Sequence, residues 1–450
     1  MIHGPVLPVL LSLALPNVLA MVAAASASIG ETAYIGILGR EPLAAMAIVF
    51  PFAMLMQMFS AGAMGGAVSS AISRALGAAD VSTARALAFH AAVIGLAGGL
   101  VFTMFFLIAG PAIYRMLGAE GVVLAYAVEY SNALFLGALA IWLANTLISI
   151  LRGTGDMVVP SVIVLVTSVG QVILGAAVGL GIGPFPRWGM TGVALAQVVA
   201  YGVAGLFLFF YLRSSRPRIR MAWTGIALQR ELFLRILRVG MLGCVSPLQT
   251  VLTILILTAL IARLGIDALA GYGIGARLEF LLIPIAFGVG VATVPMVGMA
   301  IGRRDVSRAR RVAWTGGVLS AGLVGMIGGL VSAWPNLWTR MFTAQPGVVG
   351  YAEQYLRHAG PGYAFFGLGL TLFFASQGAG KVLGPVIGSS LRLAIIAVGG
   401  FWLAAVDAPS WAYFALVSAA MTIYGLFTAA IVMWTDWLPA KTKLSSGEKA

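Results

Sequence analysis

Long apolar runs separated by short polar segments dominate the 450-residue chain. A helix needs about 20 residues to cross a hydrocarbon layer of about 30 Å, and each run is about that long or longer. The runs are too long for barrel strands and lack their alternation. We therefore predict an all-α polytopic membrane protein with twelve transmembrane helices. The predicted spans are 8–38, 43–72, 84–109, 124–151, 158–182, 189–212, 239–262, 268–300, 311–333, 356–376, 383–404 and 411–435.

The composition agrees with a membrane protein and excludes several kinds of chemistry. Apolar residues make up 61% of the chain and charged residues 9%, against about 25% charged in ordinary soluble domains. One cysteine, Cys244, rules out a disulfide framework and dithiol chemistry. The three histidines lie far apart in the sequence. We expect no enzyme, no metal and no cofactor.

The net charge of +13 becomes informative when the basic residues are assigned to loops. One set of loops and the C-terminal tail hold 20 of the 27 Lys and Arg residues, among them Arg152 and Arg392, and the opposite loops hold six. Arg277 is then the single basic residue inside a span. Because positive charge marks the cytoplasmic side, we predict that both termini are cytoplasmic and that the protein lies in the inner (plasma) membrane. The excess charge indicates contact with anionic lipid rather than with nucleic acid.

The sequence repeats once. Residues 74–85 return as residues 299–310, and residues 151–160 return as residues 376–385, so both pairs are offset by 225 residues. A shared offset in two separate loops indicates an internal repeat. Each half holds six predicted helices, so the halves share one orientation and are related by a pseudo-two-fold axis along the membrane normal.

This repeat predicts two bundles that face each other across a cleft. We expect an N-terminal six-helix bundle at 1–212, a basic cytoplasmic linker at 213–238, and a C-terminal six-helix bundle with a short tail at 239–450.

The repeated loops are interpreted as gate and turn scaffolding. Glycines such as Gly77 are expected to allow tight turns, and Arg152 is expected to pair with Asp156 within its loop. Prolines suit the first turn of a following helix. The residues of these motifs are Gly77, Asp80, Arg152, Gly153, Gly155, Pro160, Gly302, Asp305, Gly378, Gly380 and Pro385.

These loops resemble those of the multidrug and toxic compound extrusion (MATE) family. Residues 75–84 resemble its ALGAGD-xx-A motif, residues 151–160 resemble LRGxGDxxxP, and residues 183–192 resemble the stretch before helix six. The resemblance covers about residues 8–435 and implies a secondary active exporter.

Glu31 and Glu279 are the two carboxylates that fall well inside predicted spans, where an ionisable group is costly and marks a functional candidate. Glu31 precedes Arg40 by nine residues, which places it about 14 Å from the outer helix end. Tyr34 shares its helix face. Removal from water favours the neutral form of a carboxyl group, so Glu31 is a candidate proton carrier. The alternative is a structural glutamate bonded to a neighbouring helix.

The resemblance adds detail to both acids. The segment from Glu31 to Tyr34 matches a family stretch that usually reads Asp-Thr-Ala-Phe, and its acid is implicated in proton binding in the proton-coupled branch. On helix five, Gln171 and Gly175 stand where the family often has Asn and an acid.

Several polar residues near these positions are candidates to line a substrate cavity, although each also fits ordinary helix packing. They are Asn17, Tyr34, Asn145, Ser168, Gln171, Gln197 and Tyr201.

For Glu279 two interpretations stay open: a coupling role, or an internal ion pair in which Arg277 reaches across to another helix. Sodium-coupled relatives of the resembled family use acids on helices seven and ten. Here residues 239–262 offer Gln249 and hydroxyls, and residues 356–376 offer no acid. The sequence therefore favours protons over sodium.

Methionines and phenylalanines crowd helix two at 50–64, which suits either promiscuous drug contacts or packing. The predicted function is proton-coupled export of amphipathic, cationic small molecules by a monomer. The alternatives are a sodium-coupled exporter and a lipid-linked saccharide flippase; a single intramembrane arginine argues against the flippase.

Overall fold

The computed structural model describes residues 4–214, 216–221 and 227–437, and these residues form helices and connecting loops with no strand. The first half contains α1 (Val6–Leu38), α2 (Arg40–Gln57), a π-helical turn η1 (Met58–Met64), α3 (Gly65–Gly77), α4 (Val81–Met116), α5 (Gly121–Leu136), α6 (Ala138–Thr154), α7 (Val158–Leu180) and α8 (Gly189–Arg213). The second half contains α9 (Arg230–Ala262), α10 (Ile266–Gly302), α11 (Val306–Ala333), α12 (Asn336–Thr339), α13 (Pro346–Ala359), α14 (Gly362–Ala379), α15 (Leu383–Ala394), a second π-helical turn η2 (Ile395–Gly399), α16 (Gly400–Ala405) and α17 (Ser410–Trp434).

These helices supply the predicted spans. Ten continuous helices in the described part of the chain are long and apolar enough to cross a membrane, and two bent pairs, α5 with α6 and α13 with α14, bring the number to twelve. The all-helical polytopic fold is therefore confirmed. The helix α9 already begins at Arg230, so residues 230–238 of the predicted linker are helical.

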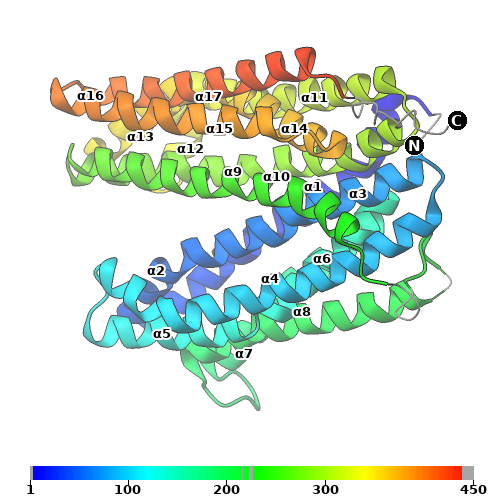
Figure 1. Cartoon of the computed structure of the whole chain (residues 1–450). Coiled ribbons are helices and arrows are strands. Elements are labelled where there is room, and N and C mark those ends of the chain that lie inside the picture. Colours follow the sequence, from blue (N-terminus) through cyan, green and yellow to red (C-terminus); the bar gives the residue numbers. More distant parts are fainter. Residues whose placement is uncertain (1–3, 215, 222–226, 438–450) are drawn as a thin grey trace, which may run out of the picture.

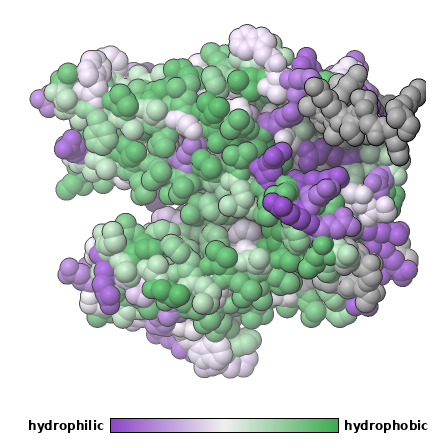
Figure 2. All heavy atoms as spheres, in the orientation of Figure 1, coloured by the Kyte–Doolittle hydropathy of each residue, from purple (hydrophilic) through white to green (hydrophobic). Residues whose placement is uncertain are grey.

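Helices α1–α8 and α9–α17 form two groups that diverge from the end of the molecule where both chain ends lie (Figure 1). The surface view shows a cleft between them that is open at the opposite end (Figure 2). The start of α1 crosses between the groups, because Val6, Leu10 and Ala14 pack into a core built from α10, α11 and α14. The predicted bundle boundaries stay a prediction.

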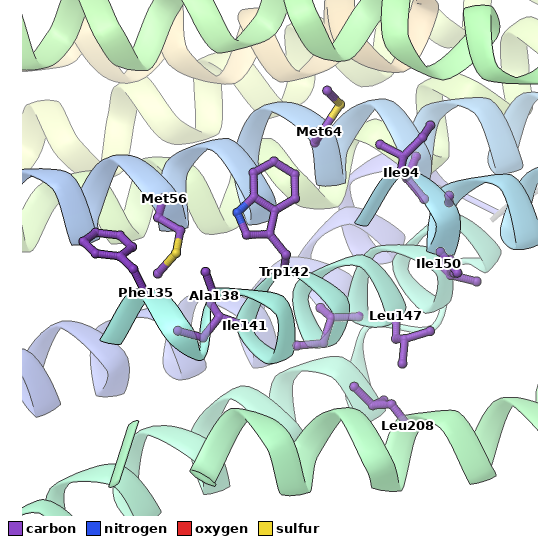
Figure 3. Packing of buried hydrophobic residues seen from close by; sticks show 14 of the residues in the cluster. Met56, Met64, Ile94, Phe135, Ala138, Ile141, Trp142, Leu147, Ile150 and Leu208 are labelled. Carbon is purple, nitrogen blue, oxygen red and sulfur yellow. The ribbon is translucent and has the colours of Figure 1, made fainter. Parts of the chain in front are cut away.

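A separate core holds the first group together. Phe135 of α5 and Trp142 of α6 pack toward Met56 and Met64 of the second span (Figure 3). Trp142 is 4% exposed and Met56 is fully buried, so these two methionines serve packing rather than the cavity.

The repeat is visible in the backbone. Asp80 and Asp305 occupy equivalent positions, and each accepts a 2.9 Å hydrogen bond from the backbone N–H three residues later at the start of its helix. Ala79 and Arg304, which precede them, share an unusual positive φ of 60° and 62°. Hydrogen bonds from Thr83 and Ser82 lower the pKa of Asp80 to about 2, so this helix cap stays ionised across the physiological range.

Gly77 and Gly302 act differently from the prediction. A Cβ at Gly77 would lie 2.2 Å from the Met299 carbonyl oxygen, and one at Gly302 would lie 2.1 Å from the Arg74 carbonyl oxygen. These contacts are equivalent under the 225-residue offset, so α3 and α10 cross tightly at the closed end. Gly153 and Gly378 also serve close packing, whereas Gly155 and Gly380, at φ of 88° and 75°, do end their helices in turns.

Two arginines lie inside the protein, contrary to the prediction. Arg152 is 1% exposed and donates to Asn17 Oδ1 at 3.0 Å, while Asp156 instead accepts from the backbone N–H groups of Val158 and Val159. Arg392 is 7% exposed within α15. The count of basic residues assigned both to loops: Arg152 directly follows the predicted span 124–151, and Arg392 was counted with the loops although it lies within the predicted span 383–404. The argument that Arg277 is the single intramembrane arginine, and the case against a flippase built on it, are therefore wrong.

Pro160 and Pro385 each occupy the third residue of a helix, α7 and α15 respectively. A proline there loses no helical hydrogen bond, as the sequence predicted.

Candidate transport cavity

A cavity of about 320 Å³ lies between the two groups of helices and is lined mainly by the first. Glu31 is the one carboxylate among the described residues of its lining. The remaining surface is largely apolar and includes Met54, Met58, Phe50 and Phe287. Arg152, 1% exposed, borders the same cavity, so the lining holds one acid and one arginine within a largely apolar surface.

Glu31 is 7% exposed, and its Oε1 accepts a hydrogen bond from the Tyr130 hydroxyl at 3.2 Å. Tyr130 comes from α5, 99 residues away, and was not among the expected partners. The equivalent residue of the second half, Tyr355, stands 225 residues later and also contacts a glutamate.

Tyr34, on the same face of α1, is 8% exposed and is not part of the cavity lining. Its hydroxyl lies where a side chain at Gly175 would be, because a Cβ there would approach it to 2.3 Å. The two residues therefore complement each other: the tyrosine fills the space left by glycine.

A second polar group lines the cavity where α2 ends and the π-helical turn begins. The Asn145 amide donates to Gln57 Oε1 and to Ser60 Oγ, both at 2.8 Å, and the Gln57 amide donates to the Tyr201 hydroxyl at 2.9 Å. Sequence reasoning missed Gln57, although it is an amide within the methionine-rich run. Such π-turns often occur at functional sites.

Three further predicted residues, Ser168, Gln171 and Gln197, also line the cavity. None of them is the hydrogen-bond partner found for Glu31. Asn17 is fully buried away from the cavity lining and links Arg152 to the Gly288 carbonyl of α10, where its amide donates at 3.1 Å. Asn17 therefore joins the two halves of the protein.

Glu279 lies in the second half and outside the lining of this cavity. The Tyr355 and Tyr363 hydroxyls donate to its Oε1, the latter at 3.3 Å. The ion pair of Arg277, one of the two interpretations left open for Glu279, is not found among the described residues: the guanidinium carbon of Arg277 lies 5.4 Å above the Phe342 ring. The two acids thus occupy separate but similar environments, each with a tyrosine from the equivalent position.

Within the part of the chain that the structure describes, no three His, Cys, Asp or Glu side chains gather where they could hold a metal.

Comparison with known proteins identifies the group to which the fold belongs. A curated FAD transporter from Shewanella oneidensis is 26% identical over 319 residues, which is 69% of each chain. A probable multidrug resistance protein, NorM of Thermotoga maritima, is 25% identical over 389 residues, covering 84% of this chain and 81% of that protein. A crystal structure of MATE in the straight conformation superposes with a TM-score of 0.88 at 22% identity, covering 96% of this chain and 97% of that one.

The family model MatE matches residues 16–177 and 244–402, one segment in each half of the repeat. With the twelve helices, the repeated loops and this match over most of the chain, the protein belongs to the MatE family of multi-pass membrane transporters.

Proposed function

We propose that the protein is a proton-coupled antiporter that exports amphipathic small molecules bearing a positive charge, with Glu31 as the residue that exchanges proton and substrate. The termini face the cytoplasm, because most basic residues lie at that end, and the cleft then opens to the outside of an inner (plasma) membrane.

The observation that carries the proposal is the single carboxylate in the cavity lining. Glu31 is buried, and the Tyr130 hydroxyl donates a hydrogen bond to it. Arg152 lines the same cavity but donates to Asn17, and no ion pair joins it to Glu31 among the described residues. A buried carboxylate without such a partner is costly unless a cation or a proton balances its charge.

Coupling follows from competition for that carboxylate. A bound cation stabilises the ionised form of Glu31, and protonation removes the charge that holds the cation. The binding of one therefore disfavours the other, and by linkage the effect is reciprocal. A proton entering from outside would release the substrate there.

The relatives support export of small molecules in general terms. NorM of Thermotoga maritima is described as a probable multidrug resistance protein, whereas the Shewanella oneidensis protein is an FAD transporter. Because these relatives differ in their substrates, they do not indicate the charge of the molecule transported here. The positive charge is inferred from Glu31 alone.

The test is efflux from proteoliposomes under an imposed gradient of either protons or sodium. We expect a proton gradient to drive ethidium transport, a sodium gradient alone to drive none, and Glu31→Gln to lower the proton-driven rate at least tenfold. Glu279→Gln, the matched acid outside the cavity lining, should retain transport. Sodium-driven transport, or an unchanged rate in Glu31→Gln, would overturn the proposal.

A further inference from the structure

Arg392 is a buried cation that the transport scheme above does not use. It lies in α15, is 7% exposed, and lines a pocket of about 80 Å³ that is formed mainly by the second half of the protein. Its Nη2 donates to Thr250 Oγ1 at 2.9 Å, while its Nε is buried without a hydrogen-bond partner. Because a guanidinium carries five N–H donors, most of its capacity remains available.

The surroundings of Arg392 do not supply a carboxylate in ion-pair contact. The Phe366 and Tyr424 rings lie 5.6 Å and 5.4 Å from its guanidinium carbon. Glu279 interacts with it electrostatically, yet the two form no ion pair among the described residues, and the Glu279 oxygen is held by Tyr355. A buried guanidinium without a paired anion is costly, which is the condition expected of a binding group awaiting its ligand.

The pocket has the donors that an anionic group needs. Arg392 supplies them, because its Nε has no partner, and the described lining residues include no acid. The hydroxyls of Ser246, Thr250 and Ser389 also line the pocket and donate to protein oxygens here, so each would have to rotate to reach a ligand. Since a water molecule occupies about 30 Å³ in the liquid, a pocket of about 80 Å³ has room for a carboxylate or part of a phosphate.

This pocket adjoins the larger cavity that contains Glu31. Met58, Ile283 and Phe287 line both spaces. A single molecule can therefore lie across the apolar wall made by these three residues, with one end toward the acid of the first half and the other toward the arginine of the second.

From this arrangement we propose that Arg392 binds an anionic group, a carboxylate or phosphate, of the transported molecule, so that the preferred substrates are amphipathic zwitterions rather than simple cations. The inference rests on the proposed function in placing the substrate between the two halves. It adds the polarity of the substrate: positive end toward Glu31 and negative end toward Arg392.

Rhodamine 110 and rhodamine 123 test this directly, because they share one fluorophore and differ in a free carboxyl group against its methyl ester. Binding is measured by fluorescence anisotropy with the purified full-length protein in phosphatidylcholine nanodiscs. We expect the wild-type protein to bind rhodamine 110 at least fivefold more tightly than rhodamine 123. Arg392→Gln should abolish the preference by weakening rhodamine 110 alone, and Arg392→Lys should retain part of it. Arg277→Gln, an exposed arginine outside both cavities, is the matched control and should bind as the wild type does.

Equal binding of the two dyes by the wild-type protein would overturn the inference, as would a parallel loss of both in Arg392→Gln. A lipid phosphate is the other source of the same chemistry. If the preference vanishes when phosphatidylglycerol replaces phosphatidylcholine, Arg392 serves a lipid head group and the inference is wrong. Failure of the proposed function is distinguished by rhodamine 123, whose binding should depend on Glu31 and not on Arg392. Unchanged rhodamine 123 binding in Glu31→Gln would count against the proposed function alone.

Discussion

At the scale of single residues, Glu31 could be identified from the sequence because an acid inside an apolar run is conspicuous. Its partner Tyr130 could not, since a hydrogen bond between residues 99 positions apart depends on how the helices pack. The same holds for Tyr34, whose hydroxyl occupies the space beside Gly175. Composition and spacing reveal which groups are unusual, and packing decides which of them meet.

Tyr130→Phe tests whether this hydrogen bond sets the proton balance of Glu31. The hydroxyl donates to Glu31 Oε1, and a hydrogen bond to a charged group contributes about 1.5–3 kcal/mol, while one pH unit corresponds to about 1.4 kcal/mol. Loss of the donor disfavours the ionised form, so the pH at which tetraphenylphosphonium binding is half-maximal should rise by about one to two units. Tyr126→Phe, on the same helix, should leave the midpoint unchanged, and an unshifted midpoint in Tyr130→Phe would show that the contact does not matter.

At the scale of helices, the two motif glycines show why a loop motif is not always a turn. Gly77 and Gly302 belong to α3 and α10, and each lies against the backbone of the other helix. The sequence marked these positions through the repeat but not their role, because a helix crossing involves residues more than 200 positions apart. The turn glycines Gly155 and Gly380 were predictable, since a helix end is a local feature.

Alanine substitutions test whether Gly77 and Gly302 are needed for the close approach of α3 and α10, since alanine alone should favour a helix. Gly77→Ala and Gly302→Ala each place a Cβ near 2 Å from a backbone carbonyl oxygen, and forced overpacking costs about 1–3 kcal/mol. We expect each to lower the unfolding temperature in detergent by several degrees. A Cβ at Gly322 would have no atom within 4 Å. The unfolding temperature of Gly322→Ala should therefore equal or slightly exceed that of the wild type, because alanine favours the helix. Equal unfolding temperatures for all three variants would contradict the close approach of α3 and α10.

At the scale of the whole molecule, the twelve spans and the internal repeat could be predicted, because hydropathy and self-similarity are properties of the sequence alone. The burial of Arg152 and Arg392 did not follow, because an arginine beside or within a predicted span is taken to reach the nearest loop unless its partners are known. Both lie inside the protein, one tied to Asn17 and the other to Thr250. Each half thus holds one acid within a span and one buried arginine, Glu31 with Arg152 and Glu279 with Arg392, and only the fold shows where these groups lie.

If Glu31 exchanges a proton for the substrate, binding of a cation must release that proton, and the released proton can be measured. Tetraphenylphosphonium is added to the purified protein in weakly buffered detergent solution near neutral pH, and released protons are followed with a pH indicator. We expect binding to release protons, up to one per bound cation, from wild type and from Glu279→Gln, and none from Glu31→Gln. Undiminished proton release from Glu31→Gln would contradict this exchange.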